Sequence, residues 1–308
     1  FCNVKKEAVI EAIDTDLIYE IPLIFSRQKL DLIILKYLNL KKRKNNDLNK
    51  WREIVDILRN TEEKVKIGVV GKYIKLQDSY KSIYEALIHG GIANRCKVIF
   101  EKVDSELIEK EGPEKFLKDV SGIIVPGGFG IRGIEGIIQG IRYARENKIP
   151  FLGICLGLQL ASIEFARNVC GLSDASSTEF NHKTKNPIIY LLPTQRGVKF
   201  KGGTMRLGAY PCKLKKGTIS FNVYKKTKIY ERHRHRYEFN NKYRELFEKK
   251  GMEIAGIYPE KDLVEIIELK EHPFFIATQF HPEFKSKPFL PHPLFSAFIK
   301  ASKLKAER

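Results

Sequence analysis

A chain of 308 residues is long enough to bury one large hydrophobic core or two modest ones. Hydrophobic residues make up 43% of it, but no apolar run approaches the length of a membrane span and the first residues do not resemble a signal peptide, so we expect a protein without membrane contacts. The five cysteines are widely spaced, which argues against a zinc site or a disulfide framework and favours a reducing compartment, the cytoplasm.

The formal charge of +18 allows two interpretations. A basic surface can bind nucleic acid, or it can be a lysine-rich, solvated surface. The lysines are scattered, the densest run (41–44) lies in a polar stretch, and no aromatic RNA-binding signature accompanies them. We therefore expect no nucleic-acid partner, although the same charge would suit the phosphates of a nucleotide.

The apolar stretches of the first 64 residues are too few and short to predict a separate domain. Apolar stretches at 8–10, 17–23 and 30–40 suggest strand and helix fragments, and only the last has clear helical spacing. Residues 41–64 are polar and charged, with one short amphipathic helix, and are predicted to be a linker. Since the chain opens with Phe1 inside an apolar stretch, we expect it to be a piece of a longer protein.

From residue 65 onward, strands and helices are predicted to alternate. The predicted strands are 65–71, 97–103, 122–126 and 149–154, and the predicted helices are 79–93, 113–119, 134–147 and one that begins near Leu158. This alternation is typical of βαβ units, and predicts an α/β fold with a mainly parallel central sheet flanked by helices. Functional sites in such sheets lie at the carboxyl ends of the strands, which here are PGGFG (126–130) and the region of Cys155.

The second half has short strands and turns that suggest a smaller antiparallel sheet. We predict strands at 187–192 and 213–224, a glycine-rich loop at 201–208, a hairpin of 263–269 with 274–280, and a closing helix at 294–304.

A strand-to-helix joint surrounds Cys155, with Gly153 and Gly157 two positions away on either side. This is the pattern of a nucleophile elbow in which cysteine replaces serine, and the glycines are expected to permit the sharp turn. The sulfur would lie at a helix N-terminus, where the helix dipole favours the thiolate. The alternative is a small core residue, which is what a lone cysteine beside glycines usually is.

A possible base follows the hairpin in the segment QFHPEF. Residues two apart on an extended strand project to the same face, so His281 and Glu283 are expected to lie side by side. His281 could then activate a cysteine, with Glu283 orienting the imidazole. Alone, this segment would more often be a surface turn, but together with the elbow it supplies a nucleophile, a base and an orienting group.

The segments GICLGLQ, PGGFG and QFHPEF resemble the class I, or triad-type, glutamine amidotransferase family, whose fold is flavodoxin-like. Five further segments narrow the resemblance to the CTP synthase family within it: GKYIKLQDSYKSIYEAL (71–87), ARNVCG (166–171), STEF (177–180), GGTMRLG (202–208) and ERHRHRYEFN (231–240). The resemblance implies that 1–40 is the tail of an amidoligase (synthetase) domain, 41–64 a linker, and 65–308 a type 1 glutamine amidotransferase domain.

The resemblance also implies roles for single residues. Cys155 would be the nucleophile of a triad with His281 and Glu283, and the amides of Gly128 and Leu156 would form the oxyanion hole. The substrate glutamine would be bound by Gln159, Glu179 and Arg236, and the lid or GTP-linked residues would be Arg206 and Lys81. A carboxylate for the substrate ammonium and a guanidinium for its carboxylate make chemical sense, although Glu179 and Arg236 by themselves could be surface charges.

The implied activity is hydrolysis of L-glutamine to glutamate and ammonia, with no metal or other cofactor in these residues. A synthetase domain of the same polypeptide, upstream of Phe1, would use the ammonia with ATP, UTP and Mg²⁺ to make CTP, with GTP as allosteric activator. Family members of this kind are expected to form homotetramers, and filaments are a further expectation. Two rivals remain: a catalytically silent regulatory or filament module, and a peptidase-like or γ-glutamyl hydrolase relative, disfavoured respectively by the intact triad and by STEF with RHRHRYE.

Overall fold

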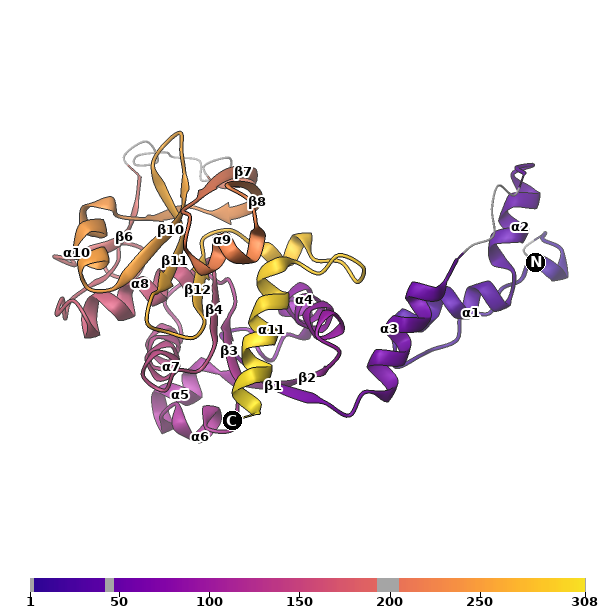
Figure 1. Ribbon diagram of the computed structural model, residues 1–308, viewed down its shortest axis with the longest axis horizontal. Coiled ribbons are helices and arrows are strands. Elements are labelled where there is room, and N and C mark those ends of the chain that lie inside the picture. The colour runs from indigo at the N-terminus through magenta and orange to yellow at the C-terminus, as the bar shows by residue number, and fades with distance from the viewer. Residues whose placement is uncertain (1–2, 42–46, 193–204, 308) are drawn as a thin grey trace. The chain divides into compact units, whose positions relative to one another are not determined.

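The computed structural model describes residues 3–41, 47–192 and 205–307, and the chain divides into two compact units (Figure 1). The smaller unit comprises residues up to 63 together with 95–97, and the larger unit comprises the remainder.

The described part of the smaller unit is helical. Its helices are α1 (Ile21–Arg27), α2 (Leu30–Tyr37) and α3 (Asn49–Asn60), with short 3-10 turns η1 (Lys6–Ala8) and η2 (Ile18–Glu20). Of the predicted strand and helix fragments, the stretch 17–23 is helical from Ile18 onward, and Pro22 occupies the first turn of α1, where its fixed φ suits a helix. Arg59 of α3 pairs with Asp16 and Glu20 at 2.7 and 3.0 Å, which links α3 to the segment around η2.

A nine-stranded mixed sheet forms the centre of the larger unit, and its strand order is β2-β1-β3-β4-β12-β11-β10-β7-β8. The strands are β1 (Lys64–Gly71), β2 (Lys97–Asp104), β3 (Gly122–Val125), β4 (Phe151–Ile154), β7 (Arg206–Leu214), β8 (Lys228–His235), β10 (Met252–Tyr258), β11 (Leu263–Leu269) and β12 (Phe275–Thr278). The pairs β1–β3, β3–β4 and β4–β12 are parallel, and the pairs from β12 through β8 are antiparallel. The predicted α/β class is confirmed, but only half of the sheet is parallel.

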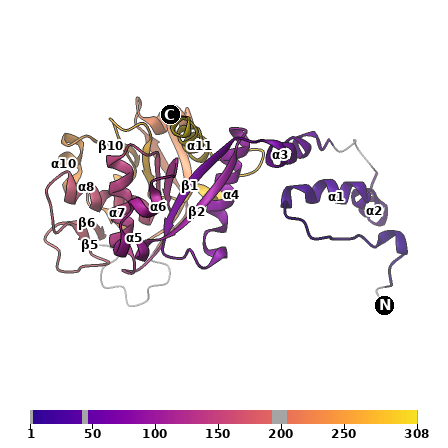
Figure 2. The same ribbon diagram turned by 90° about the horizontal axis from the view of Figure 1, so that it is seen from below.

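Helices cover both faces of the parallel half. Helices α5 (Ser105–Glu111), α7 (Ile134–Glu146) and α8 (Leu156–Asn168) lie on one face, and α4 (Lys81–Ala93) and α11 (Pro293–Ala306) lie on the other (Figures 1 and 2). β1, β3, β4 and β12 read as near-continuous apolar runs because both faces of these strands are buried. Their carboxyl ends therefore converge at one edge, beside the elbow after β4.

A small second sheet has the order β5-β6-β9. Its strands are β5 (Ser176–Ser177), β6 (Pro187–Leu191) and β9 (Tyr237–Phe239); β5–β6 is parallel and β6–β9 antiparallel. The remaining described helices are α6 (Glu114–Leu117), α9 (Ile219–Tyr224), α10 (Arg244–Lys249), η3 (Gln77–Tyr80), η5 (Asn241–Tyr243) and η6 (Pro282–Lys285).

Two expectations for the second half are wrong. The predicted strand at 213–224 is the end of β7 followed by α9, which begins where the Thr218 hydroxyl accepts a hydrogen bond from the Phe221 N–H. Residues 201–204 of the predicted glycine-rich loop lie outside the described residues, and from Arg206 onward the chain is already a strand.

The packing of α4 on α11 depends on the absence of a side chain at Gly90. A Cβ on Gly90 would lie 2.8 Å from the Phe295 carbonyl oxygen, which is backbone and cannot rotate away. Gly140 in α7 has its nearest neighbours at 3.6 Å, an ordinary contact distance. The two helical glycines are therefore a matched pair for a test of packing.

We predict that Gly90→Ala lowers the free energy of unfolding by about 2 kcal/mol, because the clash outweighs the gain in helix propensity. Gly140→Ala should raise it by roughly 0.5–1 kcal/mol through that propensity alone. Urea denaturation followed by circular dichroism measures both. Equal effects of the two substitutions would show that the α4–α11 approach is not tight.

Candidate active site

Cys155 is held in a strained backbone conformation between β4 and α8. Its φ is 54° and its ψ is −97°, unusual for a residue with a side chain. The strain costs roughly 1–3 kcal/mol and persists because both ends are fixed. The Cys155 N–H donates to the Thr278 carbonyl at 2.7 Å, and its own carbonyl accepts from the N–H groups of Leu158 and Gln159 in the first turn of α8.

The flanking glycines allow close packing, and the cysteine itself makes the turn. Neither Gly153 nor Gly157 has a positive φ. A Cβ on Gly157 would lie 2.6 Å from the Val125 carbonyl oxygen, and one on Gly153 would lie 2.9 Å from the Ala277 Cβ. The expected reason for the glycines was therefore wrong, since they let α8 start directly against β3 and β12.

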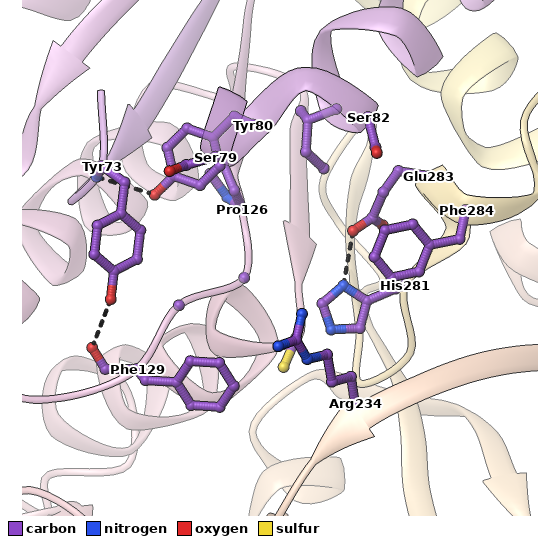
Figure 3. Close-up of a pocket in the computed structure, with 14 residues that line it drawn as sticks. Tyr73, Ser79, Tyr80, Ser82, Pro126, Phe129, Arg234, His281, Glu283 and Phe284 are labelled. Carbon is purple, nitrogen blue, oxygen red and sulfur yellow. Dashed lines mark hydrogen bonds and ion pairs between the residues drawn. The ribbon is translucent and has the colours of Figure 1, made fainter. Parts of the chain in front are cut away.

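His281 and Glu283 do meet, although not on a strand. β12 ends at Thr278, His281 precedes the 3-10 turn η6, and Glu283 lies within that turn. Nδ1 of His281 is 2.7 Å from Oε1 of Glu283 (Figure 3). The His281 N–H donates to the Arg232 carbonyl at 2.7 Å, which fixes the backbone beside β8. The turn brings the two side chains together, so the expected pairing is present and the predicted strand geometry is not.

The surroundings of His281 favour its charged form. Burial opposes the imidazolium, but the negative charges of the Cys155 thiolate and the Glu283 carboxylate outweigh it and raise the pKa of His281 to about 10. With Nδ1 directed to Glu283, Nε2 is the nitrogen of His281 left for the reaction. A charged imidazole beside a cysteine is the arrangement expected of a nucleophile and its base.

Two pockets meet at Cys155. One, of about 330 Å³, includes His281 and Glu283 in its lining, together with Tyr73, Arg234 and Phe284 (Figure 3). The other has a volume of about 340 Å³. Gly128, Phe129 and Cys155 line both pockets, so the cysteine is accessible from either one.

The second pocket gathers four of the five residues expected to bind glutamine: Gly128, Gln159, Glu179 and Arg236. It therefore carries a carboxylate and a guanidinium within reach of the nucleophile. Glu179 also fixes the loop after β3, because its Oε1 accepts the Gly130 N–H at 2.9 Å. The fifth residue, Leu156, is the first residue of α8, where a backbone N–H has no partner within the helix.

Lys72 was not predicted from the sequence, although it follows β1 at the carboxyl edge of the sheet. It is 4% exposed, and its ammonium donates to the carbonyls of Phe129 at 3.3 Å and of Gly130. Burial lowers its pKa to about 8, with Glu179 acting in the opposite direction. A buried cation thus clamps the loop that carries Gly128.

The two lid or GTP-linked candidates lie in different settings. Lys81 begins α4 with an exposed side chain and pairs with Glu85 at 3.3 Å. Arg206 is 8% exposed, pairs with Glu265 at 2.7 Å and Glu238 at 3.2 Å, and lies over two tyrosine rings.

The Arg206 cluster extends to the substrate side of the site through two buried histidines. His233 Nε2 is 3.4 Å from Glu265, His233 Nδ1 is 2.9 Å from His235 Nε2, and His235 lines the second pocket. Burial, reinforced by Arg206, lowers the pKa of both histidines, so they are neutral at neutral pH. Burial also raises the pKa of Glu238 to about 7 and of Glu265 to about 8, against the opposing charge of Arg206.

No group of metal-binding side chains occurs among the described residues, and no helix of the described chain has the length and apolarity to cross a membrane.

Comparison with known proteins shows the family of this chain. The family model for class-I glutamine amidotransferases matches residues 75–301. The chain therefore belongs to the class-I glutamine amidotransferase family.

The relatives fall in one branch of that family. CTP synthases of Trichlorobacter lovleyi and Aquifex aeolicus are each 56% identical, over 98% of this chain and 56% of their own length. The solved structure of the Trypanosoma brucei CTPS glutaminase domain with bound acivicin is 38% identical, with a TM-score of 0.73 over 77% of this chain and 93% of that one. Within the family, the chain groups with the glutaminase domains of CTP synthases, and it spans about half the length of the curated relatives it matches.

The buried carboxyl groups predict how stability depends on pH. Burial raises the pKa of Glu265 to about 8 and of Glu238 to about 7, above the ordinary 4.5, so these two groups bind more protons in the native state than in the unfolded state between pH 4.5 and 8. Their contribution to the free energy of unfolding should therefore fall as pH rises through this range.

Glu265→Gln removes the contribution of one of these carboxyl groups, so a rise from pH 5 to pH 8 should lower its urea midpoint less, or raise it more, than that of the unchanged protein. Glu245→Gln, at an exposed position of α10, is the control and should retain the full slope. Parallel slopes for Glu265→Gln and the unchanged protein would contradict the raised pKa.

Proposed function

We propose that this chain hydrolyses the side-chain amide of L-glutamine through a thioester on Cys155. The observation that carries the proposal is the position of Cys155. It lines both a pocket with His281 and Glu283 and a pocket with Glu179 and Arg236. One site thus combines a nucleophile, its base, and two opposite charges suited to the α-amino and α-carboxylate groups of an amino acid.

Substrate recognition follows from those charges. Glu179 binds the substrate ammonium, and the fork of Arg236 binds its carboxylate. Gln159 contacts the substrate between its α-amino and α-carboxylate groups and its side-chain amide. The carbonyl oxygen of that amide points to the N–H groups of Gly128 and Leu156, where the start of α8 stabilises negative charge.

In the first step, the Cys155 thiolate attacks the amide carbon and a C–S bond forms. The resulting oxyanion is held by the two backbone N–H groups. His281 gives its proton from Nε2 to the departing nitrogen, the C–N bond breaks, and ammonia leaves. Glu283 keeps the imidazole oriented through Nδ1 during the transfer.

In the second step, a water molecule attacks the thioester carbon. His281, now neutral, accepts a proton from this water, the C–S bond breaks, and glutamate leaves. The thiolate and the imidazolium are thereby restored.

The activity of a longer protein is a further part of the proposal. By likeness to the CTP synthases, the ammonia would pass to an amidoligase domain that uses ATP, UTP and Mg²⁺ to form CTP, with GTP as activator and a homotetramer as the assembly. Residues 1–40 would belong to that domain, 41–64 to a linker, and 65–308 to the glutaminase. Lys81, exposed at the start of α4, remains the candidate for a GTP-linked contact, whereas the ion pairs of Arg206 suit support of the pocket.

The assignment of Cys155 as the nucleophile can be tested, with a cysteine outside both pockets as the control. Cys155→Ala should abolish release of glutamate from glutamine, because no other described cysteine lines either pocket. Cys170→Ala is the control and should keep the activity. A glutamine-like electrophile, such as a diazo ketone, should label Cys155 alone by peptide mass spectrometry. Full activity of Cys155→Ala would refute the mechanism, and an inactive unchanged protein would favour a silent module.

Arg236 can be tested separately. Arg236→Lys keeps the charge and removes the fork, so the KM for glutamine should rise about tenfold to a hundredfold with a smaller change in kcat. Arg244→Lys is the matched control, since Arg244 lies on α10 and pairs with Asp262. It should leave both constants unchanged. An unaltered KM in Arg236→Lys would remove Arg236 from the substrate pocket.

A further inference from the structure

The side chain of Gln279 lies beside the sulfur of Cys155, and the residue belongs to the segment that leads from β12 to His281. Its side chain is fully buried, and its Nε2 is 3.8 Å from Cys155 Sγ, the distance of a hydrogen bond to sulfur. The Gln279 N–H donates to the Glu265 carbonyl at 2.9 Å, so the backbone from which the amide projects is fixed.

A second glutamine determines which way the Gln279 amide faces. Gln159 Nε2 is 3.5 Å from Gln279 Oε1 and 3.3 Å from the Tyr237 carbonyl oxygen. If the Gln279 amide were reversed, its nitrogen would face another donor and its oxygen would face the sulfur. The donors and acceptors match only with the Gln279 N–H₂ group directed at Cys155.

Both hydrogens of the Gln159 amide are thereby directed at protein acceptors. Gln159 is itself 4% exposed and lines the second pocket. What it can offer to a ligand in that pocket is its oxygen, an acceptor for N–H groups. The two glutamines thus connect the second pocket to the sulfur of Cys155.

We propose that Gln279 is a positioning residue that donates a hydrogen bond to the Cys155 thiolate and holds the sulfur in line with the substrate amide. The proposal rests on the proposed function, in which that thiolate is the nucleophile. An uncharged donor in a dry site stabilises the anion without competing with the substrate for charge. His281 lines the first pocket and supplies the proton, whereas Gln279 fixes the orientation of the Cys155 sulfur.

The alternative is that Gln279 only fills space in the core. Gln279→Met tests this, because methionine has nearly the same volume and shape and lacks the donor. Gln279→Glu keeps the size and places a carboxylate beside the sulfur. Gln139→Met, at a half-buried position of α7 that lines neither pocket, is the control.

The measurement is the rate at which iodoacetamide alkylates Cys155 as a function of pH, read from the peptide that contains it. A hydrogen bond to a charged acceptor is strong enough that its loss should move the midpoint of this profile upward by about one pH unit in Gln279→Met. Gln279→Glu should move it further, and Gln139→Met should not move it. Circular dichroism at each pH shows that the variants are folded.

A folded Gln279→Met protein with an unchanged midpoint would overturn the proposal. Should this variant not fold, ¹⁵N NMR of the unchanged protein decides the matter. The side-chain N–H signals of Gln279 should shift with the same midpoint as the alkylation rate, and signals that do not titrate would overturn the proposal. Alkylation needs no glutamine, so a protein that fails to hydrolyse glutamine can still show the shift, and the two proposals fail separately.

Discussion

The strained turn at Cys155 is the constraint on which the rest of the site depends. A residue with φ of 54° can stay there only if the strand before it and the helix after it cannot move. The close approach of Gly157 to the Val125 carbonyl supplies that rigidity, as does the hydrogen bond from Cys155 to Thr278. β3, β4 and β12 are thus locked around one residue, and the same three strands lead to Gly128, to the nucleophile and to His281.

The parallel half of the sheet and the pairing of His281 with Glu283 could be predicted from the sequence for physical reasons. Strands buried on both faces leave apolar runs that stand out from their surroundings, and β1, β3 and β4 do so. The pairing of His281 with Glu283 followed from chemistry, although its geometry did not, because a two-residue spacing suits a tight turn as well as a strand.

The antiparallel half was harder to predict because its interior contains ionisable side chains. β8 alternates regularly, yet its inward positions include Glu231, His233 and His235, so the usual apolar pattern is missing. These residues are tolerable inside only with partners from other strands, such as Arg206 of β7, and a partner far along the chain cannot be read from local spacing. For the same reason Lys72 and Gln279 were missed: their roles depend on what lies across the pocket.

Cys155 lines two pockets, and this has a consequence for inhibition. In the mechanism that we propose, the attached glutamyl group occupies the pocket with Glu179 and Arg236 and leaves the pocket with His281 free for a small molecule. A compound that fills this free pocket would block the incoming water while the acyl group is still attached. Because this pocket is present without the substrate as well, excess glutamine would not displace the compound, so its inhibition would be noncompetitive and the covalent enzyme would accumulate.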